Sequence, residues 1–168
     1  MVNKKHLAIK PIQIEDISTH AELIKRDTEN PLSIDAITSR MVSAKRKHNS
    51  CNMTVYDNDN LMGFMYGELL HKHIVRTKYY WFKNAKYAII TGSIFCILTD
   101  CRVWYPDVVY KSSKWEKLYS VTTGRKLETK KIKYIFTDDD INITFKENLK
   151  KLRITYSIHK DLTWVIQG

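Results

Sequence analysis

The chain opens with a residue-by-residue alternation of apolar and polar positions. Leu7–Ile14 follows this pattern, which predicts a first strand, and Pro11 within it favours an edge strand or an irregular one. The spacing then changes to that of helices. One helix is predicted to begin at Glu15 and to continue through HAELIKRD. A second covers Ser33–His48, with Ser33 as its N-cap and an apolar stripe along one face.

A β-hairpin is the clearest element in the next part of the chain. Its strands are Cys51–Tyr56 and Leu61–Leu70, and Asp57–Asn60 between them supplies the residue types of a tight turn. The segment that follows, His71–Lys86, is basic and aromatic. We interpret it as an inserted loop or an extra hairpin.

An uncharged apolar run, AIITGSIFCIL, occupies Ala88–Leu98. It predicts a strand covered on both faces, at the centre of a sheet. The run is too short to cross a bilayer, which takes roughly 20 apolar residues. After it the chain turns at Pro106 and enters a polar amphipathic segment. A buried central strand that leads into a loop and a helix is a common ligand-binding place in α/β proteins.

The last third of the chain predicts two helices and three short strands. In order, they are a helix over Ser112–Leu127, a strand over Lys133–Thr137, a helix over Ile141–Leu152 preceded by capping aspartates at Asp138–Asp140, and a terminal hairpin of Arg153–Ile158 and Leu162–Ile166.

The composition indicates one globular domain with excess positive charge. The 168 residues are 43% hydrophobic and 27% charged, which predicts a single domain over residues 1–168. The net charge of +10 fits an anionic partner such as nucleic acid, coenzyme phosphates or membrane lipid, and it equally fits a soluble basic surface. Three cysteines without a CxxC pair, and an N-terminus without the apolar core of a signal peptide, predict a reduced, intracellular protein that is not secreted.

The predicted order of elements is β-α-α-β-β-β-α-β-α-β-β. This order resembles the fold of the GNAT family of N-acetyltransferases. The opening LAIKPIQIEDI is similar to that family's first strand, in which Arg-Pro or Lys-Pro precedes an acidic residue. The resemblance covers nearly the whole chain. It implies an α/β (α+β) fold with a mixed, largely antiparallel sheet and helices on both faces.

A narrower resemblance concerns the second half of the chain. The run ILTDCRVWYPDVVYKSSKWEKLY, followed by INITFKENLKK, is similar to the small acetyltransferase-like internal virion proteins of short-tailed phages. This resemblance implies a protein partner in the virion or the host, and a location in the host cytoplasm or the virion.

The resemblance to GNAT enzymes also implies a loop that binds coenzyme A (CoA). In that family a (Gln/Arg)-x-x-Gly-x-(Gly/Ala) loop after the central strand holds the CoA pyrophosphate at a helix N-terminus. We place the matching loop at Tyr110–Trp115. Its candidate cofactor-binding residues are Lys111, Ser112, Ser113 and Lys114. The loop has no glycine, and Trp115 stands where a small residue belongs, so we expect acetyl-CoA to bind weakly or not at all.

Acetyl transfer to an amine also needs a proton acceptor and a proton donor. The family's donor, a Tyr on the last helix, corresponds to Phe145, which has no proton to give, so Tyr156 on the next strand is the substitute candidate. Glu68 is the candidate base, as a buried carboxylate with a raised pKa. We prefer the alternative in which Glu68 lies at the solvent end of its strand. No metal site is predicted.

Three functions remain open from the sequence. The preferred one is a catalytically degenerate GNAT-fold protein that acts in virion assembly or host interaction. The alternative is an active N-acetyltransferase that moves acetyl from acetyl-CoA to an amine. The third is a basic nucleic-acid-binding module, in which aromatic side chains between cations stack on bases. Its residues would be Arg76, Lys78, Tyr79, Tyr80 and Trp81.

Overall fold

The computed structural model describes residues 4–28, 30–106, 119–120, 123–124 and 133–165. Their strands form one seven-stranded sheet in the order β6-β5-β4-β3-β2-β1-β7. The strands are β1 (Lys5–Lys10), β2 (Met53–Asp57), β3 (Asn60–His71), β4 (Ile74–Phe82), β5 (Val103–Pro106), β6 (Tyr134–Ile135) and β7 (Ile154–Ile158). The helices are η1 (Ile14–Asp16), α1 (Ile17–Asp27), α2 (Ile34–Arg46), α3 (Ala85–Thr99), the π-helical η3 (Asp140–Thr144) and α5 (Phe145–Lys151).

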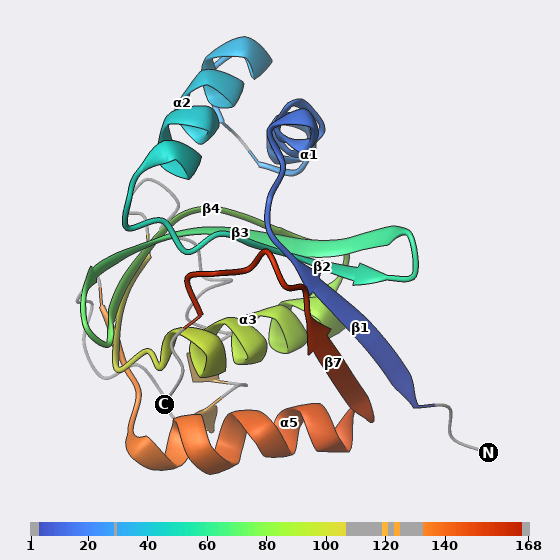
Figure 1. Cartoon of the computed structure of the whole chain (residues 1–168), viewed down its shortest axis with the longest axis vertical. Helices are drawn as coiled ribbons and strands as arrows, with labels where there is room; N and C mark the ends of the chain where they lie inside the picture. The colour runs from blue at the N-terminus through green and yellow to red at the C-terminus, as the bar shows by residue number, and fades with distance from the viewer. Residues whose placement is uncertain (1–3, 29, 107–118, 121–122, 125–132, 166–168) are drawn as a thin grey trace.

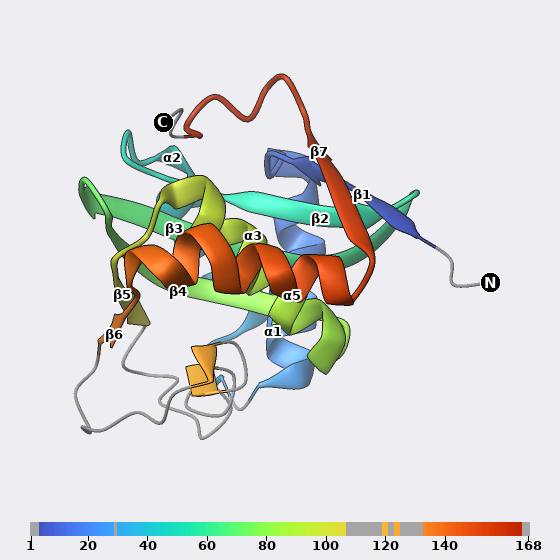
Figure 2. The ribbon, with the colours of Figure 1, turned by 90° about the horizontal axis from the view of Figure 1, so that it is seen from below.

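The helices cover the sheet on both faces. Helices α1 and α2 lie on one face, and α3 and α5 lie on the other (Figure 1), as the view from below also shows (Figure 2). Each face has its own hydrophobic core. One core joins Phe64 and Tyr66 of β3 to α1 and α2, and the other joins Met65 to α3 and α5. The expected α/β (α+β) fold with helices on both faces of a mixed sheet is confirmed.

The N-terminal predictions are largely confirmed. Strand β1 ends at Lys10, just before Pro11, and it lies between β2 and β7 instead of at an edge. Helix α2 begins after Ser33, whose side chain accepts a hydrogen bond from the Ala36 N–H at 3.1 Å, as expected of an N-cap. The predicted hairpin forms from β2 and β3 in antiparallel register.

The prediction of a central strand over Ala88–Leu98 is wrong, because these residues belong to helix α3. The side chain of Asn84 caps this helix by accepting a hydrogen bond from the Tyr87 N–H at 3.1 Å. Its other end closes at Asp100, which adopts a left-handed conformation. The run is apolar on nearly all sides because α3 lies between the sheet and α5.

The segment interpreted as an insertion, His71–Lys86, instead contributes an interior strand. It forms β4, which pairs antiparallel with β3 and parallel with β5. It therefore takes the central place that the sequence analysis gave to Ala88–Leu98. The aromatic side chains of this strand alternate between the two cores, with Tyr79 and Trp81 on the α1 side and Tyr80 and Phe82 on the α3 side.

The C-terminal predictions have mixed outcomes. The helix expected over Ile141–Leu152 forms, and Thr137 caps it: its hydroxyl accepts from the Asp140 N–H, while the Asp140 carboxylate accepts from the Thr137 N–H. The predicted terminal hairpin is wrong, since β7 pairs in parallel with β1. Most of the helix predicted over Ser112–Leu127 lies outside the described residues. No helix in the described part of the chain is long and apolar enough to cross a membrane.

Candidate functional site

Strands β4 and β5 run in parallel over only part of their length. The ladder between them extends from Ile74, opposite Val103, to Thr77, opposite Pro106. Strand β5 ends there, whereas β4 continues to Phe82 and leads directly into α3. In open α/β sheets, ligands bind beyond the carboxyl ends of such strands, at the point where neighbouring strands diverge.

A β-bulge lies where the two strands part. Tyr66 of β3 pairs with Tyr79, and Gly67 pairs with Thr77, so Lys78 is an extra residue on β4. Bulges of this kind redirect side chains and are frequent beside active sites. The side chain of the neighbouring Thr77 is fixed by a hydrogen bond, which its hydroxyl accepts from the indole N–H of Trp104 at 2.9 Å.

The N-terminus of α3 has the features of an anion-binding site. The first turn of a helix leaves N–H groups without helical partners, and the helix dipole is positive there. Asn84 satisfies one of these groups, that of Tyr87. The side chains of Lys83 and Lys86 are exposed beside it. The side chain of Tyr87 extends toward β1, where its hydroxyl accepts a hydrogen bond from the Lys5 ammonium at 3.2 Å while Lys5 pairs with Asp57.

The predicted CoA loop lies elsewhere in the chain than this site. Lys111, Ser112, Ser113 and Lys114 all fall outside the described residues. The segment that leads from the end of β4 into the first turn of α3 is Lys83–Ala88, KNAKYA. When it is aligned with the pattern (Gln/Arg)-x-x-Gly-x-(Gly/Ala), its first residue, Lys83, is basic and its last residue, Ala88, is small. It departs from the pattern at Lys86, which replaces the glycine.

Glu68, the candidate base, lies on β3 opposite Arg76, one position from the bulge. One carboxylate oxygen is 3.5 Å from the Lys47 ammonium and 3.3 Å from the Asn49 side-chain nitrogen. The other oxygen is buried and has no hydrogen-bond partner among the described residues. Burial acts to raise the pKa of Glu68, but the Asn49 hydrogen bond and the charges of Lys47 and Lys78 outweigh it. The pKa therefore lies below its usual value, not above it.

The predicted proton donor, Tyr156, lies apart from Glu68. Tyr156 is on β7, and the sheet order places β1 and β2 between it and β3, which carries Glu68. Three strand spacings of about 4.8 Å make this separation roughly 14 Å. Desolvation raises the pKa of the Tyr156 phenol. Phe145 is fully buried at the start of α5 and packs edge-on against Phe136.

The aromatic residues considered for nucleic-acid stacking pack within the protein. Tyr79 is only 8% exposed. The indole of Trp81 is hydrogen-bonded to Asp27 and packs on Phe64, and Tyr80 is stacked on Phe82. These contacts occupy the ring faces that bases would need.

The residues at the start of α3 were not among the candidates predicted from the sequence. Asn84 stands just before the apolar run, where a helix N-cap belongs, and this was the available signal. Lys47 was also missed, because only the folded chain brings the end of α2 beside β3. Among the described residues, no three His, Cys, Asp or Glu side chains cluster closely enough to hold a metal ion.

No family model and no curated protein matches the sequence. Solved structures do match the fold. The aminoglycoside N-acetyltransferase AAC(6')-Iy, in complex with CoA, aligns with a TM-score of 0.55 and 11% identity over 82% of this chain and 99% of that one. RimJ of Mycobacterium smegmatis, in complex with CoA-disulfide, aligns with a TM-score of 0.53 and 9% identity over 85% and 87% of the two chains.

A variant of the spermidine N-acetyltransferase SpeG from Vibrio cholerae aligns with a TM-score of 0.52 and 14% identity, over 68% of this chain and 77% of that one. Identities this low establish the fold alone. The chain therefore has the fold of the GNAT N-acetyltransferases.

Proposed function

We propose that the protein binds acetyl-CoA or a related acyl-CoA at the N-terminus of α3 and transfers the acyl group to an amine. The observation that supports the proposal is the arrangement along β4. The strand has a bulge at Lys78, and its pairing with β5 ends at Thr77. It then leads into the exposed N-terminus of α3, which Asn84 caps and which carries two lysines. Two of the proteins that share the fold were solved with CoA or CoA-disulfide.

The residues at the start of α3 fit a diphosphate. The N–H groups of Ala85 and Lys86 lie in the first turn, ahead of the amide that Asn84 caps, and are available to phosphate oxygens. Lys83 and Lys86 add two positive charges. The side chain of Lys86, in place of the family's glycine, limits how closely the backbone can approach a phosphate. Its ammonium compensates by neutralising part of the phosphate charge.

The bulge lies at a fitting distance from this helix end. Lys78 and Asn84 are six residues apart, which corresponds to roughly 20 Å at about 3.3 Å per residue. This span is comparable to the pantetheine arm of CoA, so a donor whose phosphates lie at α3 would bring its thioester close to Lys78. The neutral amine nitrogen attacks the thioester carbon, so that a C–N bond forms, the C–S bond breaks and CoA leaves as a thiolate. The nitrogen gives up one proton, and the thiolate takes one from water.

Glu68 is the proposed acceptor of that proton. It is the only acidic residue of β3 and β4, and it lies next to the bulge. Its lowered pKa keeps it ionised at neutral pH, and its second oxygen has no hydrogen-bond partner in the described chain. That oxygen is buried, so an amine would reach it only when neighbouring side chains move aside. The proposal does not use Tyr156, because that residue lies three strands beyond Glu68 in the sheet.

A second candidate is a GNAT-fold protein that has lost catalysis and acts through a virion or host protein partner. The observation that favours it is the ion pair between Glu68 and Lys47, because a carboxylate with a lowered pKa is a weaker base. Lys86 in place of glycine points the same way.

Calorimetry with acetyl-CoA and with CoA distinguishes the two candidates at the binding step. We expect a micromolar dissociation constant for the native protein. The double variant Lys83→Gln/Lys86→Gln should bind at least about tenfold more weakly, because it lacks two charge-assisted contacts. The matched control is Lys146→Gln/Lys150→Gln, which removes the same charge from α5 and should leave the affinity unchanged. Absence of binding by the native protein would refute the acyltransferase and favour the second candidate.

A further inference from the structure

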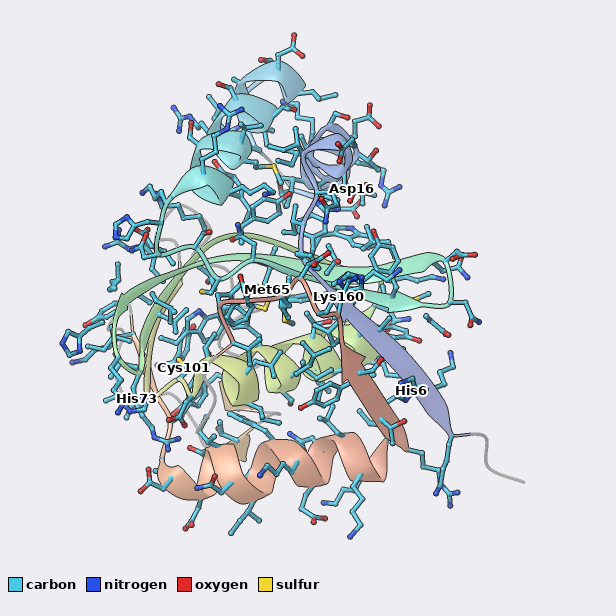
Figure 3. The ribbon with its side chains drawn as sticks, viewed as in Figure 1. His6, Asp16, Met65, His73, Cys101 and Lys160 are labelled. Atoms are coloured by element: carbon cyan, nitrogen blue, oxygen red, sulfur yellow. The ribbon has the colours of Figure 1, made fainter. Side chains whose placement is uncertain are left out.

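Three cations surround one carboxylate beside the bulge. Lys47, directly after α2, lies 3.5 Å from Glu68, and Arg76 pairs with Glu68 across the β3–β4 ladder. Lys78 interacts with both Glu68 and Lys47. We refer to Lys47, Arg76 and Lys78 as the cationic cluster. Arg76 and Lys78 belong to β4 of the β3–β4 hairpin, whose turn is marked by the label of His73 in Figure 3.

The cationic cluster lies on the face of the sheet opposite α3. Val75 belongs to the core between the sheet and α3, and Thr77 is hydrogen-bonded to Trp104 of that same core. Side chains alternate along a strand, so Arg76 between them points to the α2 side. Glu68, directly across from Arg76, shares that face, and Lys47 from the end of α2 meets it there. Helix α3 and the cationic cluster thus approach the bulge from opposite sides.

The charges of this cluster are not balanced within the described chain. Glu68 is the acidic partner of three basic groups, and it makes its ion pair with Lys47 alone. The pKa of Lys78 is lowered, first by desolvation and then by the nearby Lys47 ammonium, while Glu68 acts in the opposite direction. Arg76 is exposed and adds to the positive potential. Lys78 is half-buried and Lys47 is exposed, and an anion that enters between such neighbouring cations is attracted by both.

We propose that the cationic cluster binds a phosphate or carboxylate group of the acceptor, so that the protein acylates an amine that also carries an anionic group. This inference rests on the proposed function, because it takes the bulge at Lys78 as the place where the amine meets the acyl group.

Each charged group of such an acceptor would contact a protein group of opposite charge. The acceptor's anionic group would bind to Arg76 and Lys78, the two cations of β4. Its ammonium group faces the second oxygen of Glu68, which is buried and lacks a partner in the described residues. A polycationic amine would be repelled by the three positive charges of the cationic cluster and attracted only by the single carboxylate of Glu68. Its binding is therefore disfavoured.

The first test compares small amines that differ in charge. The acceptors are O-phosphoethanolamine, β-alanine, ethanolamine and spermidine, each assayed with acetyl-CoA by thiol release. We expect kcat/KM for at least one anionic amine to exceed that of ethanolamine by about tenfold or more, the effect of one charge-assisted contact, and spermidine to be the poorest. The ranking of the phosphate and carboxylate amines identifies the source of the anion. A preference for spermidine or ethanolamine would overturn the proposal.

Substitutions in the cationic cluster test whether its residues cause the preference for anionic amines. Arg76→Gln and Lys78→Gln should each lower kcat/KM for the anionic amine much more than for ethanolamine, so that the ratio of the two values falls toward one. The control Lys146→Gln removes one charge from the exposed face of α5 and should keep the preference. A preference that persists in both cluster variants would contradict the assignment.

A second measurement needs no transfer activity. Carbon-13 NMR of the lysine side chains, with Lys78→Gln used to assign its resonance, follows the titration of Lys78 in the native protein. Inorganic phosphate should move that titration to higher pH, whereas chloride at equal ionic strength should not. An unchanged titration refutes the cationic cluster as an anion site even where acetyl-CoA binds. A shifted titration without acetyl-CoA binding supports the site and refutes the proposed function.

Discussion

A buried histidine on α1 makes the stability of this protein depend on pH. His20 is 1% exposed, its ring stacks on Phe64 with 4.1 Å between centroids, and its Nδ1 lies 2.7 Å from the Tyr66 hydroxyl oxygen. The surrounding core disfavours the charged imidazolium. Burial therefore lowers the pKa of His20 from 6.5 to about 4.

The sign of the effect follows from which state binds the proton. Between pH 6.5 and about 4, the unfolded chain carries a protonated His20 and the folded chain does not. Stability is therefore complete above pH 6.5 and falls as the pH drops toward 4. A change in pKa from 6.5 to about 4, at about 1.4 kcal/mol per pH unit, corresponds to about 3 kcal/mol.

Urea unfolding at about pH 7.5 and about pH 4, followed by tryptophan fluorescence, measures this loss. Carboxylates also titrate in this range, so the informative quantity is the difference between the native protein and His20→Asn, which keeps a polar group toward Tyr66. The variant should lose about 3 kcal/mol less between the two pH values. The control His48→Asn, at an exposed position, should lose as much as the native protein. An equal loss in native protein and His20→Asn would refute the argument.

Further predictions concern the packing of α3, a helix cap and the proposed base. Gly67→Ala would place a Cβ 2.7 Å from both Cys51 Sγ and Phe95 Cζ, so we expect it to destabilise the protein by about 1–3 kcal/mol in urea unfolding. Gly92→Ala meets no atom within 4 Å inside α3 and should stabilise by about 0.5–1 kcal/mol; a loss of stability there would argue against the helix. Ser33→Ala should cost about 1 kcal/mol through the lost cap of α2, and an unchanged midpoint would show that the cap contributes nothing. Glu68→Gln should lower kcat by about 100-fold or more with unchanged CoA affinity in calorimetry, and a normal kcat would remove Glu68 as the base.

The sequence predicted the fold better than it predicted the identity of the central elements. The helix α3 was taken for a strand because its apolar residues cover nearly all of its sides, and such a run has no period that separates helix from strand. The deciding signals were local. Asn84 caps the run, and Ala85–Thr99 is longer than most buried strands.

The bulge at Lys78 explains why β4 was not recognised. It interrupts the alternation of the strand, so that Lys78 and Tyr79 fall on the same face, and the pattern no longer has the period of a strand. With His71–Lys86 interpreted as an inserted loop or an extra hairpin, the central strand was assigned to the next apolar run, and the candidate CoA loop was placed after that run.

Long-range pairings account for the rest of what the sequence did not reveal. Leu7 of β1 lies beside Tyr156 of β7, and no local pattern reports a contact between the two ends of a chain. The cationic cluster has the same origin. Glu68 stood out as the lone acid of its strand, but Lys47 reaches it only through the path of the chain after α2.

An amide NMR titration of the native protein with CoA shows whether the first turn of α3 binds the phosphate groups. The backbone amide resonances of Ala85 and Lys86 should move the most, and Lys83→Gln/Lys86→Gln should reduce these changes at equal CoA concentration. Saturable binding that leaves the first turn of α3 unmoved, or no change anywhere in the spectrum, would contradict this prediction.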